Sequence, residues 1–221
     1  RVREDQNSNT GKAMPEFPGY TGPANAELPV IKVKAVTHRV NPIMQTCIGL
    51  REHVSMAGIP TEASILDMVE RAMPGRVQNV YAHSSGGGKF IAVIQFKKTV
   101  PSDEGRQRQA ALLAFSAFPE LKPVILVDED VDIFDTNDVL WAMTTRMQAD
   151  VDIVTIPGVR CHPLDPSNDP ACSWSIRDHG IACKTIYDAT VPFNQKARFQ
   201  RAKFMEVDVK NSCLILPYRI E

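Results

Sequence analysis

The chain has 221 residues, of which 43% are hydrophobic, and its formal net charge is -1 at pH 7. That composition can build a core of ordinary size, and it contains no apolar stretch near 18 residues that could span a membrane. The balanced charge, without a basic run interleaved with aromatic residues, argues against nucleic acid or an anionic membrane as a partner. The five scattered cysteines form no Cys-x-x-Cys pair and indicate reduced thiols in a cytoplasmic protein.

The N-terminal part predicts a shaped loop followed by a strand. The chain does not start with Met, which suggests a fragment or a processed piece. Prolines and glycines between Gly11 and Pro23 exclude a regular helix, and the aromatic residues Phe17 and Tyr20 argue against a disordered tail. Apolar and polar residues then alternate over Ile31–Val40, which is the pattern of a half-buried strand.

The middle of the chain predicts alternating helices and strands. Thr61 can cap a helix that Pro74 and the following glycine end. The elements expected here are a helix over Thr61–Met73, strands over Arg76–His83 and Lys89–Lys97 joined by a hairpin at Ser84–Gly88, and a helix over residues 103–117.

The second half begins with Val124–Val127, a fully apolar run of the kind found in buried parallel strands. A third helix is expected over Asp135–Met147, with Asp135 as N-cap and an inner stripe of Val139, Leu140, Met143 and Met147. Val151–Ile156 is the next apolar strand, and this strand–helix–strand order predicts a right-handed crossover in a layered α/β domain. Beyond Pro157 the sequence is irregular to its end.

Two polar motifs allow more than one interpretation. Gly86–Gly88 could cradle a phosphate, but a P-loop would end in Gly-Lys-Ser/Thr and lead into a helix, so a hairpin turn is favoured. The acidic cluster Asp128–Asp132, together with Asp135, could hold Mg2+ or Mn2+, or it could be a solvated loop that caps the next helix. The five histidines show no spacing typical of a zinc site.

Glu16 is a candidate catalytic acid. It lies between Pro15 and Phe17, so its carboxyl group would be partly desolvated, which suits a proton donor near neutral pH. The alternative is an exposed loop glutamate, and the residues alone favour that alternative because most glutamates are solvated.

Three motifs in this chain resemble the UbiD family of decarboxylases. Pro15-Glu-Phe-Pro-Gly-Tyr20 looks like the family's Gly-Glu-x-x-Gly-Tyr loop. The acidic strand end up to Asp132, with Asn137-Asp-Val-Leu-Trp-Ala-Met-Thr-Thr-Arg146, resembles the family's Asp-Val-x-Trp-Ala-x-x-Thr-Arg helix and the strand before it. Tyr187-Asp-Ala-Thr190 matches the closing Asp-Ala-Thr motif. Their order and spacing agree as well, and the resemblance extends from about Glu16 to Phe193.

The resemblance implies roles for single residues. Glu16 would protonate the carbon that CO2 leaves, or deprotonate it in the reverse carboxylation. Phe17 would line the substrate pocket, and Lys122 would reach the phosphate of a prenylated FMN. The resemblance also implies Mn2+ or Mg2+ and K+ in the full enzyme, with ligands mostly outside this chain. The acidic cluster would then be structural, and no metal ligand is assigned here.

One position departs from the family pattern. The family usually places a second glutamate five residues before the first, and Gly11 stands there in this chain. Glu4 or Asp5 could take the place of that carboxylate in a longer loop. Such a loop resembles the branch of the family that acts on hydroxylated benzoates such as gallate and protocatechuate.

The resemblance also implies an α/β architecture in two parts. Residues 1–45 would be the last strands and the active-site loop of a flavin-binding split β-barrel. Residues 55–221 would be a layered α/β C-terminal domain with an irregular tail, which often contributes to a homo-oligomer. An orphaned barrel edge exposes unpaired strand, so the expected partner is the missing N-terminal segment of the same protein or another subunit.

The resemblance therefore implies a carboxy-lyase. Its reaction would be the reversible, non-oxidative decarboxylation of an aromatic or α,β-unsaturated acid with prenylated FMN. The alternative is a non-catalytic oligomerisation or interaction domain that derives from such an enzyme and binds no flavin. A metal hydrolase built on the acidic cluster is a remote third possibility.

Overall fold

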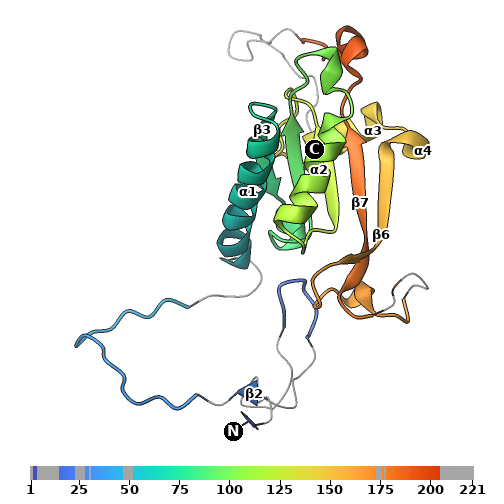
Figure 1. Cartoon of the computed structure of the whole chain (residues 1–221). Helices are drawn as coiled ribbons and strands as arrows, with labels where there is room; N and C mark the ends of the chain where they lie inside the picture. Colours follow the sequence, from blue (N-terminus) through green and yellow to red (C-terminus); the bar gives the residue numbers. More distant parts are fainter. Residues whose placement is uncertain are drawn as a thin grey trace, which may run out of the picture.

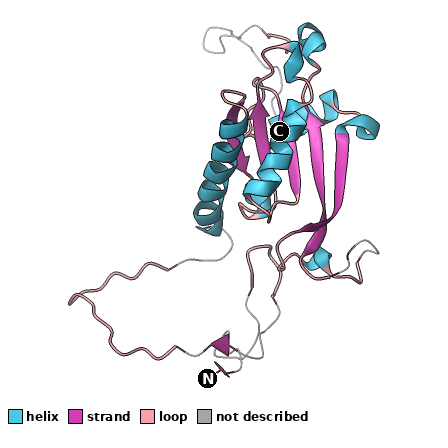
Figure 2. Cartoon of the chain, viewed as in Figure 1, coloured by secondary structure: helices cyan, strands magenta, loops and turns pink. Residues whose placement is uncertain are grey.

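The computed structural model describes residues 2–3, 15–22, 28–29, 31–46, 52–172, 176 and 178–204. Its main body is a five-stranded mixed sheet in the order β3-β4-β5-β7-β6, with helices packed on its faces (Figures 1 and 2). This confirms the mixed α/β class. Within the described residues, no helix is long and apolar enough to cross a membrane.

The elements have the following bounds. The helices are α1 (Glu52–Ala72), α2 (Arg106–Ala117), α3 (Thr136–Arg146) and α4 (Ala149–Asp152). The strands of the sheet are β3 (Val77–Ala82), β4 (Ala92–Phe96), β5 (Pro123–Val127), β6 (Ile153–Arg160) and β7 (Ile181–Ala189). A separate pair joins β1 (Val2–Arg3) to β2 (Leu28–Pro29).

Strand β5 lies at the centre of the sheet and pairs in parallel with both β4 and β7. Strands β3 and β6 close the two edges in antiparallel pairing, so the hairpin predicted between the first two strands is confirmed. The crossover that links adjacent parallel strands runs from β4 through α2 to β5. The buried, parallel character predicted for Val124–Val127 is also confirmed.

Alternate residues of the strands feed two hydrophobic clusters on opposite faces of the sheet. On one face, Ile94 and Leu126 pack with residues of α1 and α2, including Ile65. On the other face, Val93 and Ile125 pack with residues of α3. The predicted N-cap of α3 is confirmed, because the Asp135 side chain accepts from the backbone N–H of Asn137 at 2.9 Å.

Two expectations for the first half of the chain were wrong. Residues 31–40 form no strand and are exposed, because no other segment that the structure describes pairs with them. Helix α1 begins at Glu52, nine residues before the predicted cap. Pro60 lies inside that helix, and the Thr61 hydroxyl donates to the carbonyl of Ala57 at 2.7 Å instead of capping a helix end.

Expectations for the second half also need correction. Strand β6 starts at Ile153 and pairs antiparallel with β7 rather than parallel with β5, so the predicted crossover after β5 was wrong. The region after Pro157 is not irregular throughout, because it contains β7, the longest strand of the sheet. In the predicted inner stripe of α3, Val139 is buried, whereas Leu140 is 50% exposed.

Because Leu126 of β5 is completely buried against α1 and α2, its truncation tests the core directly. We expect Leu126→Ala to lower the free energy of unfolding by about 2–5 kcal/mol, through lost burial and a residual cavity. Leu112→Ala, at a position 47% exposed on α2, should change it by no more than about 0.5 kcal/mol. Chemical denaturation followed by circular dichroism measures both, and equal effects would contradict this description of the core.

Candidate functional site

Glu16 lies in a tight turn that is closed by its own backbone. Pro15 and Thr21 form a β-bridge, and the Glu16 N–H donates to the Tyr20 carbonyl at 2.8 Å. A Cβ placed on Gly22 would lie 2.8 Å from the Glu16 Cγ, so glycine at this position leaves room for the glutamate side chain. The turn thus presents a half-buried carboxyl group next to Phe17.

Phe17 anchors this turn to the C-terminal domain. Its side chain is buried, and its ring stacks on His53 of α1 with centroids 5.0 Å apart. The rings of Phe90 and His162 approach it edge-on at 5.0 and 4.8 Å. A Cβ on Gly87 would come within 2.5 Å of the Phe17 ring, so only glycine permits this approach. Three segments that are distant in sequence therefore meet around one ring.

A lysine and a glutamate complete the cluster. The Lys89 ammonium lies 5.3 Å from the centroid of the Phe17 ring and 2.9 Å from the Glu120 carboxylate. The His162 Nε2 lies 3.7 Å from the same carboxylate. We call Phe17, His53, Lys89, Phe90, Glu120 and His162 the ring cluster.

A cavity of about 370 Å³ adjoins the ring cluster. His53, Lys89 and Glu120 line it together with residues of α1, among them Thr61. The buried Nε2 atom of His53 has no hydrogen-bond partner among the described residues. A buried nitrogen without a partner beside a cavity is available to a polar ligand.

Burial lowers the pKa of His162 below its ordinary value. The charge of Lys89 and the neighbouring His53 also lower it, while Glu120 and Asp165 raise it. The imidazole is therefore neutral near pH 7, so one ring nitrogen can donate a hydrogen bond and the other can accept one.

Lys122 lies at the same end of the sheet, immediately before β5. Its ammonium donates to the Asp165 carboxylate at 2.8 Å and to the Ser167 hydroxyl. Burial alone would raise the pKa of Asp165, but the hydrogen bonds from Lys122 and Ser167 outweigh it and hold that pKa below its usual value. An ammonium has three N–H groups, so one remains available on a side chain that is 33% exposed.

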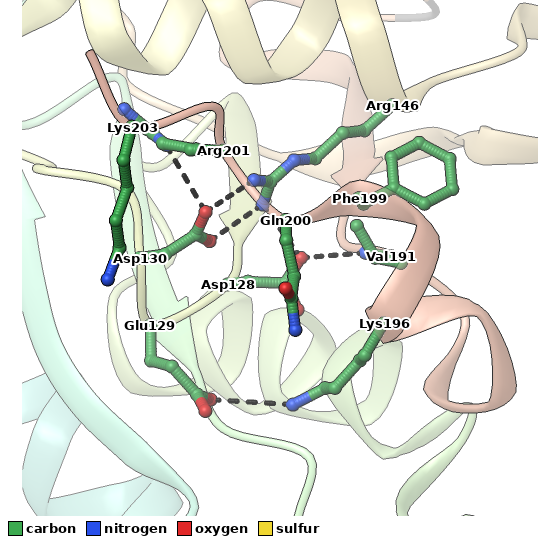
Figure 3. Close-up of a pocket in the computed structure, with 10 residues that line it drawn as sticks. All are labelled: Asp128, Glu129, Asp130, Arg146, Val191, Lys196, Phe199, Gln200, Arg201 and Lys203. Carbon is green, nitrogen blue, oxygen red and sulfur yellow. Dashed lines mark hydrogen bonds and ion pairs between the residues drawn. The ribbon is translucent and has the colours of Figure 1, made fainter. Parts of the chain in front are cut away.

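The acidic cluster after β5 forms an ion-pair network at the opposite end of the sheet (Figure 3). Arg146, with a side chain only 2% exposed, donates to Asp128 at 3.0 Å and to Asp130 at 2.6 and 2.9 Å. Arg201 pairs with Asp130 and Asp138. This network ties the loop after β5 to α3 and to the segment that follows β7.

A second cavity, of about 530 Å³, opens beside this network. Burial raises the pKa of Asp128, although the N–H of Val191 and the charge of Arg146 oppose the rise. Across the part of the chain that the structure describes, no three or more His, Cys, Asp or Glu side chains are grouped to hold a metal ion.

The structure brings three of the predicted site residues to one end of the sheet and does not describe the fourth. Glu16 and Phe17 lie together on the anchored turn, and Lys122 lies at the same end of the sheet. Glu4 lies outside the described residues. Sequence reasoning missed His53, Lys89 and His162, because each is a single residue contributed by a separate segment. A search for the spacing of zinc ligands does not detect histidines that are far apart in sequence.

The described residues form an α/β domain against which the turn that carries Glu16 and Phe17 packs. The sequence profile of the 3-octaprenyl-4-hydroxybenzoate carboxy-lyase C-terminal domain matches residues 54–189, and that of the Rift-related domain of the same enzyme matches residues 2–52. The chain belongs to the UbiD family.

Relatives of known activity are close in sequence. The chain is 63% identical to the gallate decarboxylase of Lactiplantibacillus plantarum, over 94% of this chain and 43% of the relative. A 3,4-dihydroxybenzoic acid decarboxylase from Enterobacter cloacae, solved in the apo state, is 64% identical with a TM-score of 0.88, again over 94% of this chain and 43% of that one.

A more distant structure carries a bound cofactor. It is an evolved dimeric form of a UbiD-class enzyme from Pelotomaculum thermopropionicum in complex with prFMN, 33% identical with a TM-score of 0.69 over 87% of this chain and 38% of that one. The chain thus spans about two fifths of the length of the relatives that it matches.

The charge on Glu120 should control the titration of His162. We expect Glu120→Gln to lower the His162 pKa further, because it removes the main charge that raises it. NMR titration of the histidine ring signals measures this shift. Glu70→Gln, at an exposed position on α1, serves as the control and should leave His162 unchanged.

The same titration predicts how stability depends on pH. A folded pKa below the unfolded value of about 6.5 means that the unfolded chain binds the proton more readily. The contribution of His162 to the free energy of unfolding should be fully retained above about pH 6.5 and should decline as the pH falls toward the folded pKa. A titration of His162 above 6.5, or no response to Glu120→Gln, would contradict the geometry described.

Proposed function

We propose that the protein to which this chain belongs decarboxylates an aromatic carboxylic acid, reversibly and without net oxidation, with prenylated FMN as cofactor. One observation carries this proposal: the Glu16 turn, which matches the family's catalytic loop, is anchored beside a cluster of imidazoles and a lysine. When bound, prenylated FMN would supply an electron sink for the electron pair that stays on the substrate carbon when CO2 departs.

The proposed substrates are hydroxybenzoates such as gallate and protocatechuate. The identities of 63% to a gallate decarboxylase and 64% to a 3,4-dihydroxybenzoic acid decarboxylase support this choice. The chemistry of the ring cluster agrees with it. The neutral imidazole of His162 can exchange hydrogen bonds with phenolic hydroxyls, and the Lys89 ammonium attracts the negative charge of a carboxylate or phenolate.

Each predicted residue has a proposed role. Glu16 delivers the proton to the ring carbon that has lost CO2, and takes it up in the carboxylation direction. Phe17 forms an apolar wall of the substrate pocket. Glu4 is our candidate for the second carboxylate of the family. Lys122 would hold the flavin phosphate, and its remaining N–H, next to two already engaged, fits that task.

We further propose that the missing N-terminal segment of the same protein covers residues 31–46. Figure 1 shows this stretch as an extended blue loop that lies apart from the five-stranded sheet, on the chain between β2 and α1. Its apolar side chains are between 68% and 94% exposed, namely Ile31, Val33, Val36, Val40, Ile43 and Met44. Exposed apolar side chains along an extended stretch without a pairing partner among the described residues fit a surface that another segment covers. The remaining Mn2+ or Mg2+ and K+ ligands would lie in that segment, and the assembled enzyme would form a homo-oligomer.

The decisive variant is Glu16→Gln in the full-length polypeptide, co-expressed with a flavin prenyltransferase. We expect CO2 release from gallate, protocatechuate or 4-hydroxybenzoate to fall by at least about 100-fold, because an amide cannot deliver the proton. The flavin absorption band should persist, since Glu16 is not proposed to hold the cofactor. Glu70→Gln is the matched control and should retain wild-type turnover.

Two outcomes would count against the proposal. Wild-type turnover by Glu16→Gln would remove this glutamate from the mechanism. A wild-type protein that has no flavin band and releases no CO2 from any of these acids would favour the non-catalytic interaction domain.

A further inference from the structure

We propose that Lys184 of β7 is a positioning residue that holds Glu120 against Lys89 and His162. This inference deepens the proposed function and rests on it, since the ring cluster is the proposed substrate site. Its first measurement, however, does not depend on any enzymatic activity.

Lys184 is a buried cation bound to backbone rather than to an acid. The residue is 1% exposed, and its Nζ donates to the carbonyls of Pro119 and Leu121, each at 2.6 Å. The same atom lies 4.9 Å from the centroid of the Phe115 ring. Among the described residues, no carboxylate lies within ion-pairing distance of it.

The two carbonyls that Lys184 binds stand on either side of Glu120. The carbonyl of Glu120 itself accepts from the thiol of Cys161, with Sγ at 3.5 Å. Three successive carbonyls are thus bound by side chains that approach from β7 and from the end of β6. The backbone cannot rotate at Glu120 without breaking one of these bonds, so the direction of its Cα–Cβ bond toward Lys89 and His162 is fixed.

The side chain held in this way connects the ring cluster. The Glu120 carboxylate lies 2.9 Å from the Lys89 ammonium and 3.7 Å from the His162 Nε2. Among the described residues, Glu120 provides the only carboxylate within 4.0 Å of both the Lys89 ammonium and the His162 Nε2. A displaced Glu120 would leave the Lys89 charge unpaired beside Phe17 and His162.

A purely structural role gives a poor account of a lysine at this position. Burial lowers the pKa of Lys184, with a smaller opposing effect from Cys161, so the charged form is disfavoured there. A hydrophobic residue of similar volume often stabilises a core as well as a buried charge does. Lysine provides two N–H groups in either protonation state, at the tip of a chain long enough to reach both carbonyls.

The test is an NMR titration of His162 in the full 221-residue chain. Lys184→Met keeps the bulk and removes both donors, and we expect it to lower the His162 pKa, as Glu120→Gln does. The sign is diagnostic, because direct loss of a nearby positive charge could only raise that pKa. In the double variant the two shifts should not add, since both act by removing the Glu120 carboxylate from His162.

The pKa of His162 also depends on the charges of Lys89, His53 and Asp165, so these residues must remain in place in every variant. The matched control is Lys98→Met. Lys98 is 2% exposed and donates to Glu104 and to the Val191 carbonyl, in contacts separate from the ring cluster. Its loss should destabilise the fold and leave the His162 titration unchanged.

Cys161→Ala is a gentler variant that decides the matter if Lys184→Met does not fold. It removes only the thiol bonded to the Glu120 carbonyl, and we expect a smaller shift of His162 in the same direction. An unchanged His162 titration in a folded Lys184→Met, or in Cys161→Ala when that variant alone folds, would overturn the inference. Additive shifts in the double variant would do so as well.

The full-length enzyme adds a functional arm. We expect Lys184→Met to lower kcat about 10- to 100-fold with KM nearly unchanged, because a misplaced Glu120 disturbs orientation more than attraction of the substrate. Lys98→Met should keep wild-type kcat. If the wild-type enzyme releases no CO2, the proposed function fails, whereas the NMR result still decides whether Lys184 positions Glu120.

Discussion

The structure depends on one constraint, which is that β5 is hydrogen-bonded by parallel strands on both sides and buried on both faces. Such a strand cannot shift or bend, so its two ends are fixed points. Lys122 precedes it and Asp128 follows it, six residues apart, which corresponds to about 20 Å of extended chain. No ion pair among the described residues joins the ring cluster to the Arg146 network, so the two stand as separate clusters at opposite ends of one sheet.

Strand β7 shows why sequence periodicity revealed only part of the fold. Short apolar runs such as β5 and capped helices such as α3 could be predicted, because their burial follows from their own residues. In β7, Lys184 and Asp188 occupy buried positions, and they interrupt the apolar pattern that marks a buried strand. Both are stable there because partners from elsewhere in the chain satisfy them. Two carbonyls bind Lys184, and Asp188 accepts from Arg108 at 2.7 Å and from Gln107 at 3.0 Å.

The candidate site likewise contains residues that a local motif identifies and residues that only the folded chain brings together. Glu16 could be proposed from the sequence because the motif that resembles the family's loop is local, a turn of prolines, glycines and rings. His53, Lys89 and His162 could not, because they come from α1, the β3–β4 linker and the stretch after β6, and only the folded sheet brings them together. The strand predicted over Ile31–Val40 failed for a related reason. Alternating residues form a strand only if a neighbouring segment pairs with them, and no described segment pairs with residues 31–40.

The Phe17 contact joins these local and non-local parts. Phe17 lies within the segment that matches the Rift-related domain, whereas Phe90 and His162 lie within the segment that matches the C-terminal domain. Glu16 is the neighbour of Phe17 in a turn closed by backbone hydrogen bonds, so its position follows that of the Phe17 ring. One of the rings packed against Phe17 is that of His162, whose Nε2 lies 3.7 Å from the Glu120 carboxylate and whose pKa that carboxylate raises. Glu120 and Glu16 are thus connected through the packed rings of His162 and Phe17.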